Sequence, residues 1–175
     1  PISVSAIIGV GCLLLLGCLT WHDAGQALST RVIMIVVASL ALGKALVATN
    51  MASYLAGSFV TLSQGLPVPL ILSLFMLIIS IMTNIVSNNA AAVIGTPIAI
   101  AIATQLNVDP EPFVLAVLFG ANMSYATPFG YQTNLLILSA GGYKFSDFLR
   151  VGIPLTLIMW LGFSMVLPTL YGLWT

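Results

Sequence analysis

Two short polar segments interrupt sequence that is otherwise apolar enough for a lipid bilayer. The first is Thr83–Asn89 (TNIVSNN), and the second, further along the chain, is Thr127–Asn134 (TPFGYQTN). Inside a bilayer, each backbone N–H or C=O group without a hydrogen-bond partner costs several kcal/mol. Irregular backbone is therefore tolerated at membrane depth only where it is buried in protein or lines a cavity. A pair of interrupted apolar segments predicts the central binding site of a membrane transporter.

The composition indicates the environment of the chain. Hydrophobic residues make up 60% of it and charged residues only 5%, against roughly 25% charged residues in soluble domains. Four basic and four acidic residues could not cover a soluble domain of 175 residues. We therefore expect an all-α integral membrane protein that crosses the plasma membrane or the bacterial inner membrane several times. The net charge of zero argues against nucleic acid as a partner.

The first apolar run, Ile2–Trp21, is long enough for one crossing, which needs ~20 residues. It has no basic N-terminal region and is too long for the apolar core of a signal peptide. On a helix, Cys12 and Cys18 would lie ~9 Å apart along the axis, which is beyond the reach of a disulfide. We expect two free thiols and no metal or other cofactor at them. Because the chain begins with Pro1 rather than Met, we expect it to be a piece of a longer protein.

The remaining apolar runs predict further helices within a single transmembrane domain over residues 1–175. Val32–Thr49 predicts a second crossing, and the more mixed Asn50–Gly65 predicts an interfacial or irregular helix. The later elements are bounded by Pro, Gly and acidic residues. They are two helical arms at about 67–105 with Pro67 and Pro69 in the first turn, a discontinuous helix at about 112–140 that is helical up to Ala126, and a last span at about 148–174 with Asp147 as its N-cap.

The segment Leu70–Thr104 is too long to be one straight helix that crosses the membrane once. It would be ~52 Å long, against a hydrocarbon core of ~30 Å. Each arm beside the first break would have ~16 residues and a length of ~24 Å, slightly short of a crossing. Two interpretations are open: two spans joined by a surface turn, or a re-entrant hairpin whose tip ends inside the membrane.

The distribution of charge predicts which side each loop faces. The loop at 141–150 has a basic excess from Lys144 and Arg150, whereas the loop at 105–112 carries only acidic residues. The positive-inside rule therefore places 141–150 in the cytoplasm and 105–112 outside. A re-entrant hairpin, if present, would then open from the outside.

The first break carries groups that suit an anion. Ser87, Asn88 and Asn89 precede a helix that is predicted to begin at Ala90, and they can cap it. Backbone N–H groups and the positive end of the helix dipole would then face whatever occupies the tip. Such a site binds an anion without any cationic side chain.

The same break carries oxygen ligands for a small alkali cation. They are the carbonyls of Thr83 and Val86, the Thr83 hydroxyl and the Asn88 amide oxygen. The second break adds groups of the same kind from Ala126, Thr127 and Asn134, the last as the predicted N-cap of the next helix. Either break alone is also compatible with an ordinary loop of capping residues, and it is their pairing that favours a function.

Few other residues are candidates for chemistry. Lys44 lies inside the second predicted span, where an ionisable residue is a functional candidate, but its side chain could equally reach a membrane interface. His22 lies in a polar loop without a visible ligand partner. The sequence has no nucleophile–base pair, HExxH motif, phosphate-binding Gly loop or Cys/His cluster, so we expect no enzyme.

The motifs at the breaks resemble those of a known family. Ser87-Asn88-Asn89, followed by an Ala-rich helix, resembles the Ser-Asn-Thr hairpin tip of the divalent anion:sodium symporters, the dicarboxylate and sulfate transporter family. Ala126-Thr127-Pro128, with Asn134 shortly after, resembles the second break of that family. The segment 141–152 (GGYKFSDFLRVG) resembles the approach to its last helix. The resemblance covers the chain from about Leu40 to its end.

This resemblance implies an architecture of two inverted repeats, each with a re-entrant hairpin and a discontinuous helix. The protein would work as a homodimer, with a transport domain that moves like an elevator against a fixed scaffold. This chain would be the second repeat with one preceding span, and the first repeat would be missing from it. The resemblance also implies ligands: Thr83, Val86, Asn88 and Ala126 around a sodium ion, and Ser87, Asn88, Asn89 and Thr127, with Asn134 close by, for the anion.

Two departures from the family pattern leave the anion open. Asn89 stands where the family usually has Thr, and Phe129 with the residues through Thr133 lengthens the second break. The sequence predicts a secondary active transporter that couples inward sodium flow to uptake of a dicarboxylate, citrate or sulfate. One alternative is a proton- or ATPase-coupled oxyanion, arsenite or citrate–metal permease of related architecture. Another is a membrane scaffold subunit in which the breaks are packing kinks.

Overall fold

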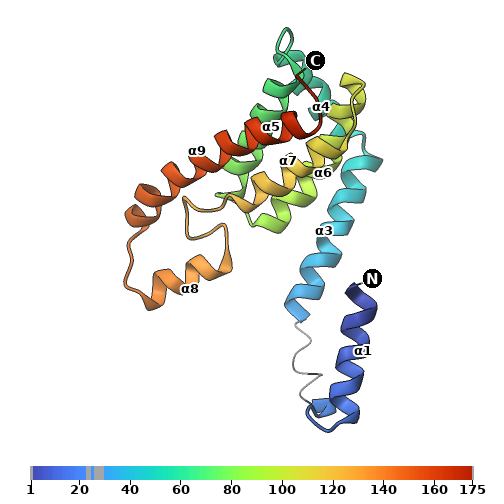
Figure 1. Cartoon of the computed structure of the whole chain (residues 1–175), viewed down its shortest axis with the longest axis vertical. Helices are drawn as coiled ribbons and strands as arrows, with labels where there is room; N and C mark the ends of the chain where they lie inside the picture. Colours follow the sequence, from blue (N-terminus) through green and yellow to red (C-terminus); the bar gives the residue numbers. More distant parts are fainter. Residues whose placement is uncertain (1, 23–24, 26–29, 175) are drawn as a thin grey trace. The chain divides into compact units, whose positions relative to one another are not determined.

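The computed structural model describes all residues except 1, 23–24, 26–29 and 175 (Figure 1). Every regular element among the described residues is an α-helix, as the sequence predicts. Contacts divide the chain into two units, Pro1–Val37 and Ala38–Thr175. The single domain expected from the sequence stays a prediction, and each unit is described by itself.

In the first unit, helix α1 (Ile2–Leu15) is shorter than the predicted run to Trp21. Gly17 turns the chain with φ 69°, a left-handed value. The Cys18 N–H then donates to the Leu13 carbonyl at 3.0 Å, which is the closure typical of a helix that ends at a left-handed glycine. The predicted end of this helix was therefore wrong. Cys12 and Cys18 are both free thiols.

A sharp bend separates α3 (Thr30–Ala48) from α4 (Met51–Leu62). The axis of Leu40–Ala48 meets that of α4 at 71°. Asn50 makes the bend with φ 54°, a conformation that asparagine adopts more readily than most residues. The mixed segment expected after the second span is therefore a helix, joined to its predecessor through an irregular turn.

The two predicted arms are α5 (Val68–Thr83) and α6 (Asn88–Leu106), joined through residues 84–87. Pro67 is the N-cap of α5, and Pro69 lies in its first turn, close to the predicted positions. Helix α6 is long and apolar enough to cross a membrane. Helix α5 has 16 residues and a length of ~24 Å, short of the ~30 Å hydrocarbon core. The short α5 fits a re-entrant hairpin and the longer α6 fits a full crossing, so both interpretations stay open.

The segment predicted to be a discontinuous helix contains α7 (Glu111–Asn122) and α8 (Gln132–Ala140), and their joint role as one interrupted span stays a prediction. Residues 123–131 between them are irregular, so the second break begins before Thr127, and its last residues, 132–134, lie in α8. Helix α7 ends at Asn122, so the predicted helical stretch up to Ala126 was too long. Backbone groups of Met123, Ala126 and Thr127 are instead hydrogen-bonded to Asn84 of the first break.

The last helix, α9 (Phe145–Leu170), begins before the predicted start at Phe148. Lys144 is its N-cap, and Asp147 lies in the first turn with Oδ2 accepting from the Lys144 N–H at 2.8 Å. Asp147 therefore stabilises the start of the helix from inside the first turn, and its prediction as the N-cap was wrong. At the other end Gly172 has φ 61°, which terminates the helix before the predicted end at Trp174.

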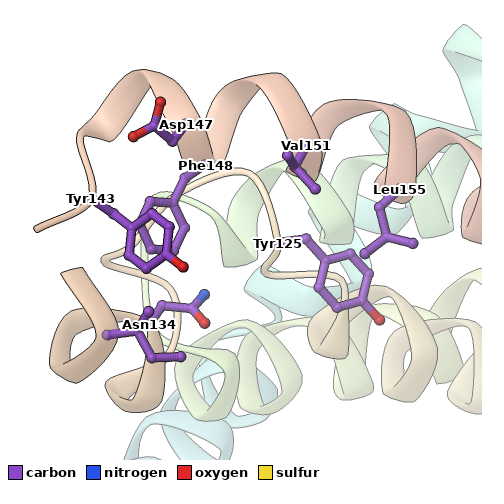
Figure 2. Close-up of a pocket in the computed structure, with 9 residues that line it drawn as sticks. Tyr125, Asn134, Tyr143, Asp147, Phe148, Val151 and Leu155 are labelled. Atoms are coloured by element: carbon purple, nitrogen blue, oxygen red, sulfur yellow. The ribbon is translucent and has the colours of Figure 1, made fainter. Parts of the chain in front are cut away.

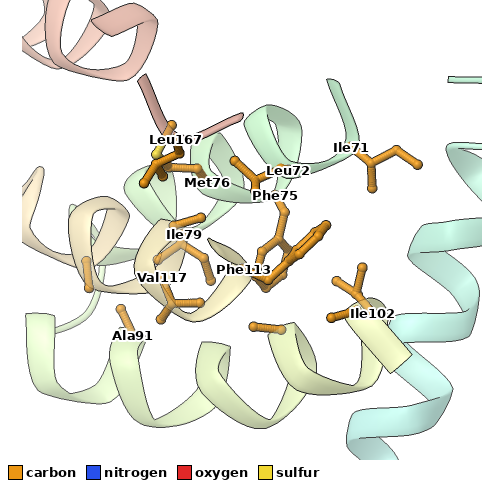
Figure 3. Packing of buried hydrophobic residues seen from close by; sticks show 14 of the residues in the cluster. Ile71, Leu72, Phe75, Met76, Ile79, Ala91, Ile102, Phe113, Val117 and Leu167 are labelled. Carbon is orange, nitrogen blue, oxygen red and sulfur yellow. The ribbon is translucent and has the colours of Figure 1, made fainter. Parts of the chain in front are cut away.

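The core of the second unit lies between α5, α6 and α7 (Figure 3). Its largest fully buried side chains include Phe113, Leu72, Met76 and Ile102. Glycines allow the helices to approach closely: a Cβ on Gly120 would lie 2.9 Å from the Met76 carbonyl oxygen, and one on Gly95 would lie 2.8 Å from Ile79 Cδ1. Close packing of this kind is typical of membrane helices. It holds the ends of α5, α6 and α7, and hence both breaks, in fixed positions.

Polar contacts hold helix α9 against α5. The Trp160 Nε1–H donates to the Ser73 carbonyl at 2.9 Å, and the hydroxyls of Ser73 and Ser164 lie 2.7 Å apart. Beyond its C-terminus, the Tyr171 hydroxyl donates to Glu111 Oε1 at 2.8 Å. This hydrogen bond raises the pKa of the Tyr171 phenol above its ordinary value of 10.0, because the carboxylate stabilises the protonated form. The start of α7 and the end of α9 are thus tied together.

Lengths and composition agree with a membrane protein. Among the described helices, α6 and α9 are long and apolar enough to cross a membrane, and the bent pair α3–α4 is a third candidate. Helix α9 exposes large apolar side chains along much of its length, including Ile158 and Met165, each with 66% of its surface accessible. Such side chains suit contact with lipid or with other membrane helices.

Candidate functional site

The structure brings the two polar breaks into direct contact, and Asn84 makes that contact. Its side-chain oxygen Oδ1 accepts the N–H groups of Ala126 at 3.0 Å and Thr127 at 3.1 Å. In return, the Thr127 hydroxyl donates to the Asn84 carbonyl at 2.6 Å. The two breaks paired in the sequence analysis are therefore in physical contact.

The amide nitrogen of Asn84 completes this junction. Nδ2 donates to the Ser80 carbonyl at 2.7 Å and to the Met123 carbonyl at 3.0 Å. With Oδ1 also accepting two bonds, the side chain uses its full hydrogen-bonding capacity. Backbone groups of Met123, Ala126 and Thr127 thus find partners on Asn84 instead of continuing α7, which is why the helix ends at Asn122.

Asn84 was not among the residues singled out from the sequence. It stands directly after Thr83 in the first break, so its position was visible. What the sequence did not show is its partners, which lie 39 to 43 residues away along the chain.

Thr83 is the buried centre of the first break, with no exposed surface. Its Oγ1 lies 2.7 Å from the Ala121 carbonyl oxygen and 2.9 Å from Asn88 Oδ1. A hydroxyl has one proton to donate, so it cannot fully satisfy two acceptors at once. Three oxygens therefore converge at this point, and oxygens are the ligands that a hard cation prefers.

A glycine of the second break lies against the Thr83 carbonyl. A Cβ on Gly130 would lie 2.5 Å from the Thr83 carbonyl oxygen and 2.8 Å from Ser124 Cβ. Only glycine leaves room for the two segments to approach so closely. The backbone of the second break therefore reaches one of the predicted sodium ligands directly.

The anion side of the predicted site lies at the start of α6. Ser87 is the N-cap, as expected, and its Oγ accepts the Ala90 N–H at 3.3 Å. The helix begins at Asn88 rather than at the predicted Ala90. Within the described part of the chain, the N–H groups of Asn88 and Asn89 have no acceptor. The positive end of a 19-residue helix thus presents unpaired donors at the tip.

The remaining predicted ligands differ in how closely they join this cluster. Val86 is 36% exposed and its N–H donates to the Met82 carbonyl at 2.9 Å. In the described structure it forms no hydrogen bond with the other predicted sodium ligands. Thr127 has its hydroxyl proton on the Asn84 carbonyl, so in this arrangement its hydroxyl offers an anion no proton.

Asn134 has a different role from the one predicted. Tyr131 is the N-cap of α8 and makes no side-chain cap, so Asn134 as the cap was wrong. It lies in the first turn, where Nδ2 donates to the Ser124 carbonyl at 2.9 Å and to the Thr127 carbonyl at 3.3 Å. Its amide therefore ties the second break to the start of α8.

A cavity of about 300 Å³ lies beside the second break, between α8 and α9 (Figure 2). Figure 2 shows the Tyr143 and Phe148 rings side by side near Asn134, with Tyr125 further along the cavity. The two rings meet edge to face at 6.4 Å between centroids. The walls are mostly apolar, and the charged side chain that lines them is the carboxylate of Asp147. Of the residues predicted to bind the anion, Asn134 lines this cavity, whereas Ser87, Asn88, Asn89 and Thr127 do not.

Neither break contains a charged side chain, and no Lys, Arg, Asp or Glu occurs in residues 45–108 or 112–143. Over the described residues, no group of three or more His, Cys, Asp or Glu side chains could hold a metal ion. The chemistry available at the breaks is therefore that of hydroxyl, amide and backbone groups. Lys44 is exposed in an apolar groove between α3 and α6, and both of its interpretations stay open.

Comparison with known proteins gives the family. A family model described as citrate transporter matches residues 1–174. The uncharacterized transporter sll0640 of Synechocystis is 35% identical over 172 residues, which is 98% of this chain and 28% of that protein. Sodium/sulfate cotransporters 1 and 2 of Chlamydomonas reinhardtii are 28% and 27% identical over 85% and 86% of this chain, and 17% of each cotransporter.

The chain thus spans less than a third of the length of these relatives. Their names agree with the resemblance to sodium-coupled anion transporters that the break motifs indicated. Because the family model covers nearly the whole chain, the protein belongs to the citrate transporter family, whose members are membrane transporters rather than enzymes.

Proposed function

We propose that this chain forms the sodium- and anion-binding part of a secondary active transporter that couples sodium entry to the uptake of a divalent anion. The observation that carries the proposal is the junction of the two breaks. It gathers buried oxygens beside unpaired backbone N–H groups and includes no charged side chain. Relatives named sodium/sulfate cotransporters support the same coupling ion.

The sodium ion would bind at the oxygens around Thr83. The hydroxyl of Thr83 and the amide oxygen of Asn88 are already 2.9 Å apart. A cation between them would relieve the competition of two acceptors for a single proton. The carbonyls of Val86 and Ala126 would complete the set, in the way that unwound backbone coordinates sodium in other transporters.

The anion would bind at the start of α6. The N–H groups of Asn88 and Asn89 and the helix dipole favour negative charge there, and Ser87 and Thr127 border the same tip. Without a cationic side chain, these groups alone do not neutralise a double negative charge. A sodium ion bound beside the anion would supply the missing charge, and this mutual requirement would couple the two fluxes.

The larger architecture is part of the same proposal. The segment 67–106 would be a re-entrant hairpin that opens from the outside, and α7 with α8 a discontinuous helix. A first inverted repeat elsewhere in the full-length protein would supply a second hairpin. Transport would follow an elevator movement in a homodimer.

Two anions have specific support. The family description points to citrate, and the names of two relatives point to sulfate. Asn89 at the tip offers a larger amide in place of a hydroxyl, so its contacts would help to decide between these anions.

Sodium-dependent thermal stabilisation of the purified full-length protein tests the proposal. A ligand that binds only the folded state raises the unfolding temperature as its concentration rises. We expect Na⁺ to stabilise the wild type where K⁺ does not, and sulfate or citrate to add stability only with Na⁺ present. Asn88→Ala should abolish the sodium effect.

The matched control is Asn122→Ala, because Asn122 is exposed and its Nδ2 donates only to the Leu118 carbonyl of its own helix at 2.7 Å. It should keep the wild-type response to sodium. A wild type indifferent to Na⁺, or an Asn88→Ala protein that responds fully, would overturn the proposed site.

A further inference from the structure

We infer that Asn84 is a positioning residue for sodium: its side-chain oxygen sets the direction of the Ala126 carbonyl, and thereby the sodium affinity of the site. This inference rests on the proposed function, because it concerns the same sodium ion. Asn84 is not one of the proposed ligands. It acts through the backbone of the second break, to which it is bonded at both Ala126 and Thr127.

The argument begins with peptide geometry. In a trans peptide, the C=O of one residue and the N–H of the next point in opposite directions, and the described chain has no cis peptide bond. The Thr127 N–H points at Asn84 Oδ1. The Ala126 carbonyl therefore points away from the Asn84 side chain, and its direction is fixed as long as this bond is made.

The peptide between Tyr125 and Ala126 gives a second observation on the orientation of this backbone. The Ala126 N–H also points at Asn84 Oδ1, so the Tyr125 carbonyl must point to the opposite side, away from α5. There it meets α9, where a Cβ on Gly152 would overlap the Tyr125 carbonyl oxygen. Gly152 is buried. The peptide before Ala126 is thus held from two sides, by an asparagine oxygen and by the bare backbone of a glycine.

The rest of the Asn84 side chain fixes the position of that oxygen. Its Nδ2 is bonded to the Ser80 carbonyl of its own helix and to the Met123 carbonyl. The oxygen therefore cannot rotate away without breaking bonds to both. An alanine at this position would leave the N–H groups of Ala126 and Thr127 without their acceptor, and the Ala126 carbonyl free to turn.

The test compares sodium half-saturation of Asn84→Ala, Asn84→Asp and Asn122→Ala in the full-length protein, by thermal stabilisation and by uptake. Loss of a group that orients a metal ligand weakens metal affinity about tenfold or more, so we expect a rise of about that size for Asn84→Ala. At saturating Na⁺, the maximal uptake rate and the anion half-saturation should stay near wild type, which a merely structural defect would not allow. Asn84→Asp loses the donor to the Ser80 and Met123 carbonyls but keeps an oxygen for the two N–H groups, so its sodium half-saturation should rise less than that of Asn84→Ala.

The outcomes separate this inference from the proposed function. A wild type without sodium response would remove both. A sodium-responsive wild type with an unchanged Asn84→Ala variant, or with Asn84→Asp as impaired as Asn84→Ala, would overturn the inference alone. If Asn84→Ala does not fold, the Asn84→Asp variant decides. A rise of its sodium half-saturation below about tenfold supports the inference, and a larger rise contradicts it. Failure of both to fold would also contradict it, because Asn84 would then serve folding rather than sodium binding.

Discussion

A single buried hydroxyl lies at the centre of this molecule's chemistry. Thr83 has two acceptor oxygens within 2.9 Å and one proton to share between them. One proton satisfies only one of the two acceptors fully, and a hydrogen bond that is not fully made has a cost. Occupation by a sodium ion would turn that cost into a source of affinity.

Thr83→Ala and Thr83→Ser form a matched pair that tests this. Alanine removes the hydroxyl and leaves the Ala121 carbonyl without its donor, which costs about 1–3 kcal/mol of folding free energy. We expect Thr83→Ala to lower the unfolding temperature and to weaken sodium binding. Thr83→Ser keeps the hydroxyl and should retain sodium half-saturation within about threefold of wild type, since Ser and Thr hydroxyls bond alike. Equal sodium responses of the two variants would count against Thr83 as a ligand.

At this scale the sequence predicted local chemistry well and long-range partners poorly. Ser87 as the cap of α6 followed from its place before an apolar run, and this prediction is confirmed. Asn134 as a cap was wrong, because its amide instead bonds the Ser124 and Thr127 carbonyls. Asn84 was missed because its bonds reach another segment of the chain, and only the packing of α5 against α7 creates them.

Helices in this molecule are placed by close backbone approach. Gly120 and Gly95 bring α7 and α6 close to neighbouring side chains and backbone, and Gly152 does the same for α9 and the second break. The order and type of the elements were predicted from their apolar runs. Their ends were predicted less well. Helix α7 ends early because the Met123 carbonyl accepts a hydrogen bond from Asn84 Nδ2. Helix α9 begins early because Asp147, in its first turn, accepts the Lys144 N–H.

Gly152→Ala and Gly162→Ala make a test of this packing on one helix. A Cβ at position 152 would overlap the Tyr125 carbonyl carbon and lie 2.6 Å from the Ala126 Cα, and backbone atoms cannot move aside as a flexible side chain would. We expect Gly152→Ala to destabilise the protein by about 1–3 kcal/mol or more. Gly162 has no such neighbour within 4 Å, so its replacement should be neutral or stabilise the helix by about 0.5–1 kcal/mol. Thermal unfolding in detergent measures both, and equal effects would contradict the packing account.

Across the described part of the molecule, the helices meet at two irregular breaks, which hydrogen bonds from Asn84 to Met123, Ala126 and Thr127 join. This is what the bilayer demands, because unpaired backbone groups at membrane depth are costly. The composition predicted the membrane and the all-α fold. Composition does not say which loop faces which side of the membrane; that prediction rests on the positive-inside rule alone. Nor does composition say how deep in the bilayer the first break lies.

Labelling of single cysteines tests the predicted sides. In a full-length background in which every cysteine, Cys12 and Cys18 included, is replaced by Ala, we introduce Asp109→Cys or Ser146→Cys, both at exposed positions. An impermeant thiol reagent added to intact cells should label position 109, and position 146 only after the membrane is opened. The reverse pattern would invert the orientation derived from Lys144 and Arg150.

The central claim is sodium-driven accumulation of a divalent anion, and uptake tests it most directly. The measurement is uptake of radiolabelled sulfate, citrate and succinate into proteoliposomes that hold the full-length protein, with and without an inward sodium gradient. We predict that at least one of these anions accumulates above its external concentration only when sodium flows inward. No accumulation of any of the three by a folded protein that carries this junction would contradict the account.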